Sequence, residues 1–168
     1  MTRLLWQKAA AVAAKSHRHQ KRLDGGPYVS HCFRVALTVN VVFGFDDPEI
    51  LAAALLHDTI EDCEVDYDEI YEKFGQNVAD YVAVMTKDKR LEETIREVSY
   101  DKQLSEGPWQ GRLIKLADVF DNFSDLPKES RSTFVDKVER ILSITADDKQ
   151  LQGAREKLLN LMKELAPC

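Results

Sequence analysis

The stretch that decides the fold is residues 50–62, which read Ile-Leu-Ala-Ala-Ala-Leu-Leu-His-Asp-Thr-Ile-Glu-Asp. Its first seven residues are apolar on every side of a helix, so we expect a buried helix from Ile50 to about Glu61. An adjacent His57 and Asp58 lie near the end of this helix. An ionised aspartate is rarely interior unless it is paired or binds a metal. This segment therefore predicts both a helical core and a functional site at its edge.

Helical spacing brings further acids to the same end. Glu61 follows His57 at i+4, and Glu61 and Asp62 follow Asp58 at i+3 and i+4, so the four side chains are expected to converge. Three carboxylates so close would repel and raise one another's pKa. A cation removes this difficulty, and imidazole with carboxylate suits manganese, iron, zinc or magnesium.

Two other segments supply residues of the same chemistry. His31 follows a Gly-Gly-Pro loop, and Asp118 lies inside an apolar helical segment. On that segment Lys115, Asp118 and Asn122 share one helix face at i, i+3 and i+7, where a cation and an amide would grip phosphate oxygens and a sugar or base edge. Such a ligand set leaves coordination positions open for water and substrate. The predicted metal ligands are His31, His57, Asp58 and Asp118.

Helical periodicity dominates the chain, and no convincing strand alternation appears. We therefore predict one all-α domain over residues 1–168, with about seven to nine helices. Asp46 or Asp47 before Pro48 is a typical helix start, and Asp66 is a candidate cap. The expected helices cover about residues 4–20, 29–43, 50–61, 66–74, 77–85, 89–105, 109–123 and 130–165, the last broken near 145–148.

Composition restricts the functional classes. The net charge of −6 argues against a protein that binds duplex nucleic acid. The three cysteines, Cys32, Cys63 and Cys168, are scattered without metal or redox spacing, which is typical of reduced thiols. The short apolar run near the N-terminus is too interrupted for a signal peptide or a membrane span. We expect a cytoplasmic protein that makes no membrane contact.

Each element alone has a plainer interpretation. His31 could be an ordinary core histidine, and Lys115 with Asp118 an ordinary helix ion pair. The acids of residues 61–69 could form a solvated face. The basic stretch 15–22 could be an exposed helix end or a positive rim for a phosphate-rich substrate. His57-Asp58 followed by Glu61-Asp62 is harder to explain without a function, because an uncompensated buried pair is costly.

The order of these motifs resembles the hydrolase domain of RelA/SpoT-type enzymes, and in stand-alone form the small alarmone hydrolases that include the metazoan SpoT homologues. The resemblance spans roughly residues 8–126. It implies a compact HD-domain bundle and a manganese-dependent removal of the 3′-pyrophosphate from guanosine tetra- or pentaphosphate. The motifs that carry it are His57-Asp58-Thr59-Ile60-Glu61-Asp62, Tyr28 with His31, and Lys115-Leu116-Ala117-Asp118 with Asn122.

The resemblance also implies roles for single residues. The four predicted ligands would hold the metal, and Glu61 and Asp62 would orient and deprotonate the attacking water. Arg22 would contact the nucleotide, Lys115 would help to hold the site, and Asn122 would contact the ribose or a phosphate.

Several positions depart from the family pattern. Leu23 stands where a basic or small polar residue is usual, and Val119 stands where a basic residue is usual. Ser124 replaces a common arginine, and Cys32 replaces a proline. Phe134 is the nearest match to an aromatic segment that encloses the nucleotide. These departures leave open a related hydrolase of adenosine alarmones or NADPH, and a non-catalytic nucleotide sensor. The intact pair Glu61-Asp62 weighs against the sensor. The oligomeric state is left open, and a homo-oligomer is allowed.

Overall fold

The computed structural model describes residues 4–165, and these residues form helices with no β-strand. Nine of the described α-helices are longer than one turn, so the all-α prediction is confirmed. Their bounds are α1 (Leu5–Ser16), α2 (Val29–Leu37), α3 (Pro48–Leu56), α5 (Tyr67–Phe74), α6 (Gln76–Met85), α7 (Glu93–Glu106), α8 (Trp109–Asp125), α9 (Val135–Ile144) and α10 (Gln152–Leu165). The four-residue α4 (Thr59–Asp62), the π-helix η1 (Thr38–Val42) and the 3-10 turns η2 (Lys128–Ser130), η3 (Ser132–Phe134) and η4 (Lys149–Leu151) complete the set.

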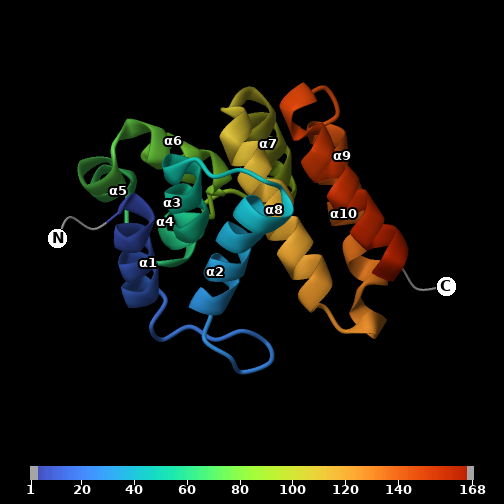
Figure 1. Cartoon of the computed structure of the whole chain (residues 1–168), viewed down its shortest axis with the longest axis horizontal. Helices are drawn as coiled ribbons and strands as arrows, with labels where there is room; N and C mark the ends of the chain where they lie inside the picture. The colour runs from blue at the N-terminus through green and yellow to red at the C-terminus, as the bar shows by residue number, and fades with distance from the viewer. Residues whose placement is uncertain (1–3, 166–168) are drawn as a thin grey trace.

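The helices pack around α3 and α8. The apolar α3 contacts α1, α2 and α6, while α8 contacts α2 on one side and α9 and α10 on the other (Figure 1). Six of the nine residues of α3 are buried, as its apolar sequence predicts. The Asp47 side chain accepts hydrogen bonds from the amides of Glu49 and Ile50 and so caps this helix.

The helix that carries the His-Asp pair is shorter than expected. It ends at Leu56, and the chain turns through His57 and Asp58 before α4 begins at Thr59. The side chains of His57 and Thr59 hydrogen-bond the carbonyl oxygens of Ala54 and Leu56, at 2.9 and 2.7 Å. Because these bonds satisfy carbonyls that a continuing helix would use, the helix stops here. His57 and Asp58 therefore lie at a junction and not inside one helix.

Other boundaries also differ from the sequence expectation. Helix α1 ends at Ser16, and α2 changes into the π-helix η1 at Thr38. Residues 86–92 form a loop, so α7 starts only at Glu93. This helix is mostly solvated, but Tyr100 and Leu104 are buried against the core.

Helices α6 and α8 approach closely at Gly111. A Cβ atom at this position would lie 2.2 Å from Cγ1 of Val84, so only glycine fits. None of the described helices is long and apolar enough to cross a membrane. Cys32 and Cys63 are free thiols, and Cys168 lies outside the described residues.

Candidate metal centre

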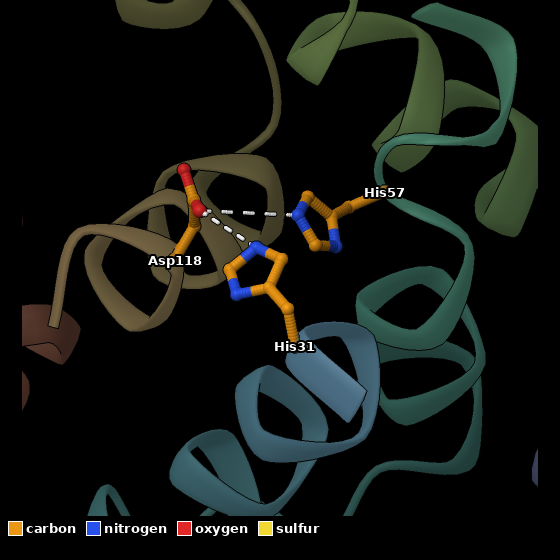
Figure 2. Close-up of side chains that lie close together, drawn as sticks. All are labelled: His31, His57 and Asp118. Atoms are coloured by element: carbon orange, nitrogen blue, oxygen red, sulfur yellow. Dashed lines mark ion pairs between the residues drawn. The ribbon is translucent and has the colours of Figure 1, made fainter. Parts of the chain in front are cut away.

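Three buried side chains from distant segments converge on one point. His31 comes from α2, His57 from the α3–α4 junction and Asp118 from α8 (Figure 2). Oδ1 of Asp118 lies 3.2 Å from Nε2 of His31 and 3.9 Å from Nε2 of His57. One candidate ligand atom from each residue lies within 4.8 Å of the other two.

Asp58 lies beside this group. Its Oδ2 atom is 2.9 Å from Nε2 of His57 and 3.7 Å from Nε2 of His31. The Tyr28 hydroxyl donates a 2.6 Å hydrogen bond to the same oxygen. Cys32, His57 and Asp58 form a second group with candidate ligand atoms within 4.8 Å. The structure thus brings together all four residues that the sequence predicts as metal ligands.

The arrangement fits a divalent cation. Nε2 of His57 is buried and has no hydrogen-bond partner, although a carboxylate oxygen of Asp58 lies only 2.9 Å away. A buried nitrogen without a partner is destabilising, whereas a cation among these atoms would satisfy it. Two imidazoles and two carboxylates are donors that manganese, iron and zinc accept.

The electrostatics favour a cation as well. Burial raises the pKa of Asp118, but Lys115 and the two histidines outweigh it and hold that pKa well below its usual range. Burial also raises the pKa of Asp58, but the nearby charge of His57 outweighs this effect and lowers that pKa to about 2. Both carboxylates are therefore ionised at neutral pH. Burial lowers the pKa of His31, but hydrogen bonds to Asp118 and Asp121 raise it to about 9, so a cation that binds here must displace the proton on Nε2.

The histidines are held by groups behind them. Nδ1 of His57 lies 2.9 Å from the Ala54 carbonyl oxygen, and Nδ1 of His31 lies 2.6 Å from Oδ2 of Asp121. Arg34 donates to both oxygens of Asp121, at 2.6 and 3.0 Å. Such partners fix the tautomer and leave Nε2 to face the metal position. Asp121 is absent from the sequence prediction, although its position at i+3 from Asp118 in an apolar segment is a usable signal.

Glu61 and Asp62 lie on α4 and are held by the loop of residues 86–92. Oε2 of Glu61 accepts a 2.9 Å hydrogen bond from the Lys87 amide. Oδ1 of Asp62 pairs with Nζ of Lys89 at 2.5 Å. Neither acid belongs to the candidate ligand groups found among residues 4–165. The sequence did not indicate that Lys87 and Lys89 contact these acids, because both lysines lie in a segment that is expected to form a loop and an exposed helix.

The three residues predicted to bind substrate form a chain of contacts with Asp118. Lys115 donates to Oδ2 of Asp118 at 2.8 Å, and Asn122 donates to Oδ1 at 2.6 Å. Arg22 donates to Oδ1 of Asn122 at 3.1 Å and to Asp125 at 2.9 Å. The structure therefore places Arg22, Lys115 and Asn122 on one side of the ligand cluster.

Comparison with known proteins shows the family of this chain. Residues 9–146 match the HD domain family. This chain belongs to the HD domain family. A mouse relative named guanosine-3′,5′-bis(diphosphate) 3′-pyrophosphohydrolase MESH1 is 35% identical over 162 residues, which cover 94% of this chain and 90% of the relative. An Aquifex aeolicus relative, guanosine-3′,5′-bis(diphosphate) 3′-pyrophosphohydrolase, is 38% identical over 71% of this chain and 17% of its own length.

A solved structure described as a metazoan ortholog of SpoT that hydrolyzes ppGpp has a similar fold. Its TM-score is 0.85 at 26% identity, with 98% of this chain and 97% of that chain covered.

Two cavities open beside the ligand cluster of this HD domain. One of about 160 Å³ is lined by Lys115, Asp118 and Asn122 together with residues of α7 and α9. The other, of about 420 Å³, is lined by Arg22, Tyr28 and Asn122 and by the segment that follows α8. Asn122 and Phe134 line both cavities.

The positions that depart from the family pattern lie in different places. Leu23 lines the larger cavity, and its side chain is fully exposed. Val119 is buried and lines the smaller cavity. Ser124 donates a hydrogen bond to the Asp121 carbonyl oxygen at 2.9 Å. In the basic stretch, His17 is buried near Gln20 and Cys63 and does not form an exposed rim.

Proposed function

We propose that this chain is a metal-dependent phosphohydrolase that removes the 3′-pyrophosphate from guanosine 3′,5′-polyphosphates and yields GDP or GTP and pyrophosphate. The observation that carries the proposal is the buried cluster of His31, His57 and Asp118, with Asp58 beside it. Relatives that carry the name of this activity match 94% of the chain. We assign the activity to a single domain over residues 1–168.

The metal in this proposal is manganese. His31, His57, Asp58 and Asp118 would hold it, because their donor atoms lie together and one of them lacks a partner. When bound, a divalent cation supplies positive charge that makes water nucleophilic near neutral pH and neutralises phosphate oxygens.

Glu61 and Asp62 would orient the attacking water and accept its proton. One oxygen of each carboxylate is engaged by the 86–92 loop, through the Lys87 amide and Nζ of Lys89. These contacts hold one oxygen of each carboxylate, and Oε1 of Glu61 lies 3.9 Å from Nζ of Lys89. A carboxylate within hydrogen-bond reach of the nucleophile is the usual general base for such a step.

Arg22, Lys115 and Asn122 would bind the nucleotide. Lys115 and Asn122 both touch Asp118, so groups that they bind lie next to the metal position. Arg22 is paired with Asp125, and a phosphate that enters the larger cavity would compete for its guanidinium.

The partner is then a small nucleotide in the cytoplasm. Duplex nucleic acid fits poorly with the net charge of −6. We make no assignment of oligomeric state beyond allowing a homo-oligomer.

The test is a comparison of substrates. The manganese-loaded protein is incubated separately with guanosine tetraphosphate, its adenosine counterpart and NADPH, and products are separated by ion exchange. We expect GDP and pyrophosphate to form fastest from the guanosine compound. The Glu61→Ala variant should lose hydrolysis.

Three results would contradict the proposal. Preference for the adenosine compound or NADPH would move the function to a related phosphohydrolase, which Leu23 and Val119 in the cavity walls make a real alternative. No turnover of any of the three would indicate a pocket built for another substrate. A Glu61→Ala variant that loses hydrolysis but keeps its full cellular effect would favour a nucleotide sensor.

A further inference from the structure

Cys32 is a buried thiol next to the candidate metal centre. It follows His31 on α2, and its side chain is fully buried. Its sulfur, a ring nitrogen of His57 and a carboxylate oxygen of Asp58 lie within 4.8 Å of one another. Cys32 replaces the proline of the family pattern, so neither the motifs nor the proposed mechanism uses it.

His57 supplies a second, independent sign of a ligand at this point. Its Nε2 atom is buried and has no hydrogen-bond partner among the described residues, and it lies 2.9 Å from Oδ2 of Asp58. Nδ1 of the same ring lies 2.9 Å from the Ala54 carbonyl oxygen, so Nε2 is the nitrogen left for a cation. A nitrogen that is destabilising without a partner thus faces a carboxylate of the Cys32 group.

A plain core role does not account for the surroundings of Cys32. A buried free cysteine usually behaves as a small apolar side chain. Cys32 instead lies beside an imidazole and a carboxylate. Cys63 provides the contrast, because its sulfur lies 3.4 Å from Nδ1 of His17 but belongs to no candidate ligand group within residues 4–165.

The three donors select a different class of cation from the manganese centre. Thiolate sulfur is a ligand for zinc and other soft or borderline cations, whereas manganese prefers oxygen donors. A tetrahedral zinc ion with three protein ligands keeps its fourth position for water. The sulfur–zinc bond forms as the thiol loses its proton to solvent.

The two candidate groups share His57. His31, His57 and Asp118 form one group, and Cys32, His57 and Asp58 form the other. Figure 2 shows His57 turned towards Asp118, with Nε2 3.9 Å from Oδ1 of that residue. Because one nitrogen lone pair binds one cation at a time, a cation held by Cys32 would take His57 from the other group.

We propose that Cys32, His57 and Asp58 form a binding position for zinc, and that zinc at this position competes with manganese for His57. Competition with a working manganese centre rests on the proposed function, whereas zinc binding through Cys32 does not. Zinc would then inhibit the hydrolase, because it takes one ligand from the manganese centre.

The test uses cobalt as a spectroscopic substitute for zinc on the metal-free, full-length protein, with a phosphine reductant that keeps the thiols reduced. A cobalt–thiolate bond gives an intense near-ultraviolet charge-transfer band that nitrogen and oxygen ligands do not give. We expect wild type to develop this band up to one equivalent of cobalt and to lose it when zinc is added. Cys32→Ser and Cys32→Ala should not develop it, although Cys63 and Cys168 are still present.

Cys63→Ser is the matched control and should keep the full band. Manganese affinity, followed by the electron spin resonance signal of free manganese, should match that of wild type in the Cys32 and Cys63 variants, because manganese does not use the thiol. The zinc concentration that releases half of the bound manganese should rise about tenfold or more in Cys32→Ser, since even a group that only supports a metal ligand is worth that much. It should stay unchanged in Cys63→Ser.

Wild-type protein without a cobalt–thiolate band, or a Cys32→Ser variant that keeps the band, would overturn the inference. A band that depends on Cys32, with no release of manganese by zinc, would overturn the competition for His57. A band that depends on Cys32, in a protein whose manganese-loaded form leaves guanosine tetraphosphate intact, would contradict the proposed function alone.

Discussion

His31 contacts a carboxylate through each of its ring nitrogens. Nε2 lies 3.2 Å from Asp118 and Nδ1 lies 2.6 Å from Asp121. Arg34 contacts both oxygens of Asp121 and keeps this carboxylate ionised and in place. A proton on Nδ1 shared with Asp121 leaves the lone pair of Nε2 for a cation. We therefore expect Asp121 to position His31 at the proposed metal centre.

We predict that Asp121→Asn weakens manganese binding by about 10- to 100-fold, which is the usual cost of losing such a supporting carboxylate. Titration followed by the electron spin resonance signal of free manganese measures this affinity. Asp125→Asn is the control, because Asp125 also pairs with Arg34 but is not in contact with His31. Equal manganese affinity in Asp121→Asn and wild type would contradict this role.

At the residue scale the sequence identifies the clustered His and Asp side chains better than the residues that hold them in place. His57 and Asp58 stand out because their neighbours are apolar, and the motif order identifies His31 and Asp118. Asp121 does not stand out, since acids are common on helices and its partner Arg34 is 87 residues away. The burial of Tyr100 could not be predicted either, because its sequence context is charged and indicates an exposed helix.

At the scale of elements, the break between α3 and α4 shapes the centre. Apolar periodicity predicts one helix through Glu61, because periodicity does not register hydrogen bonds from side chains to the backbone. The bonds from His57 and Thr59 end the helix and place Asp58 at the start of α4. His57 and Asp58 still lie beside His31, although through a turn and not through helical spacing. Glu61 and Asp62 instead contact the 86–92 loop.

An ionic network joins α7 to α9 and to the loop before α7. Glu97 accepts from Lys87 and from Arg140, and Arg140 also contacts Asp101. Burial raises the pKa of Glu97, but the two cations outweigh it and bring the pKa to about 2. Because the folded-state pKa lies below the ordinary value of 4.5, Glu97 adds stability above pH 4.5 that is lost as pH falls through about 2.

We predict that Glu97→Gln lowers the free energy of unfolding by about 1 kcal/mol at neutral pH, since solvent screens this partly exposed group. The difference from wild type should shrink as pH falls from about 4.5 toward 2. Urea unfolding at a series of pH values measures it. Glu106→Gln, on the same helix and exposed, should show no such trend. A difference that stays constant over the whole pH range would rule out this origin.

At the scale of the whole molecule, the proposed metal centre connects segments that are far apart in the sequence. Residues 31, 57–58 and 118 come from α2, the α3–α4 junction and α8, and these helices form the middle of the fold (Figure 1). A ligand that binds only the folded chain stabilises it by mass action. A cation at this point should therefore stabilise the packing of the whole bundle.

We predict that manganese at 100 times its dissociation constant raises the free energy of unfolding by about 2.7 kcal/mol. Differential scanning calorimetry over a series of manganese concentrations measures the rise in melting temperature. Asp58→Asn, which removes a predicted ligand charge, should show little rise. An equal rise in the variant and in wild type would mean that manganese binds elsewhere.

The overall class of the fold could be predicted from periodicity alone, because most helices carry an apolar face and clear start signals such as Asp47 and Asp66. The cavities could not be predicted. Arg140 and Glu97 are 43 residues apart and meet only through packing of α9 on α7. Contacts at such separations depend on tertiary structure that no local pattern encodes.

The most direct test of the central claim is hydrolysis of guanosine tetraphosphate by metal-stripped protein as manganese is added back. Bound manganese and the rate of GDP formation are followed in the same titration. We predict no turnover without metal, and a rate that rises with bound manganese and saturates at one equivalent per chain. Full turnover in the presence of a strong chelator, or no turnover once manganese is bound, would contradict the claim.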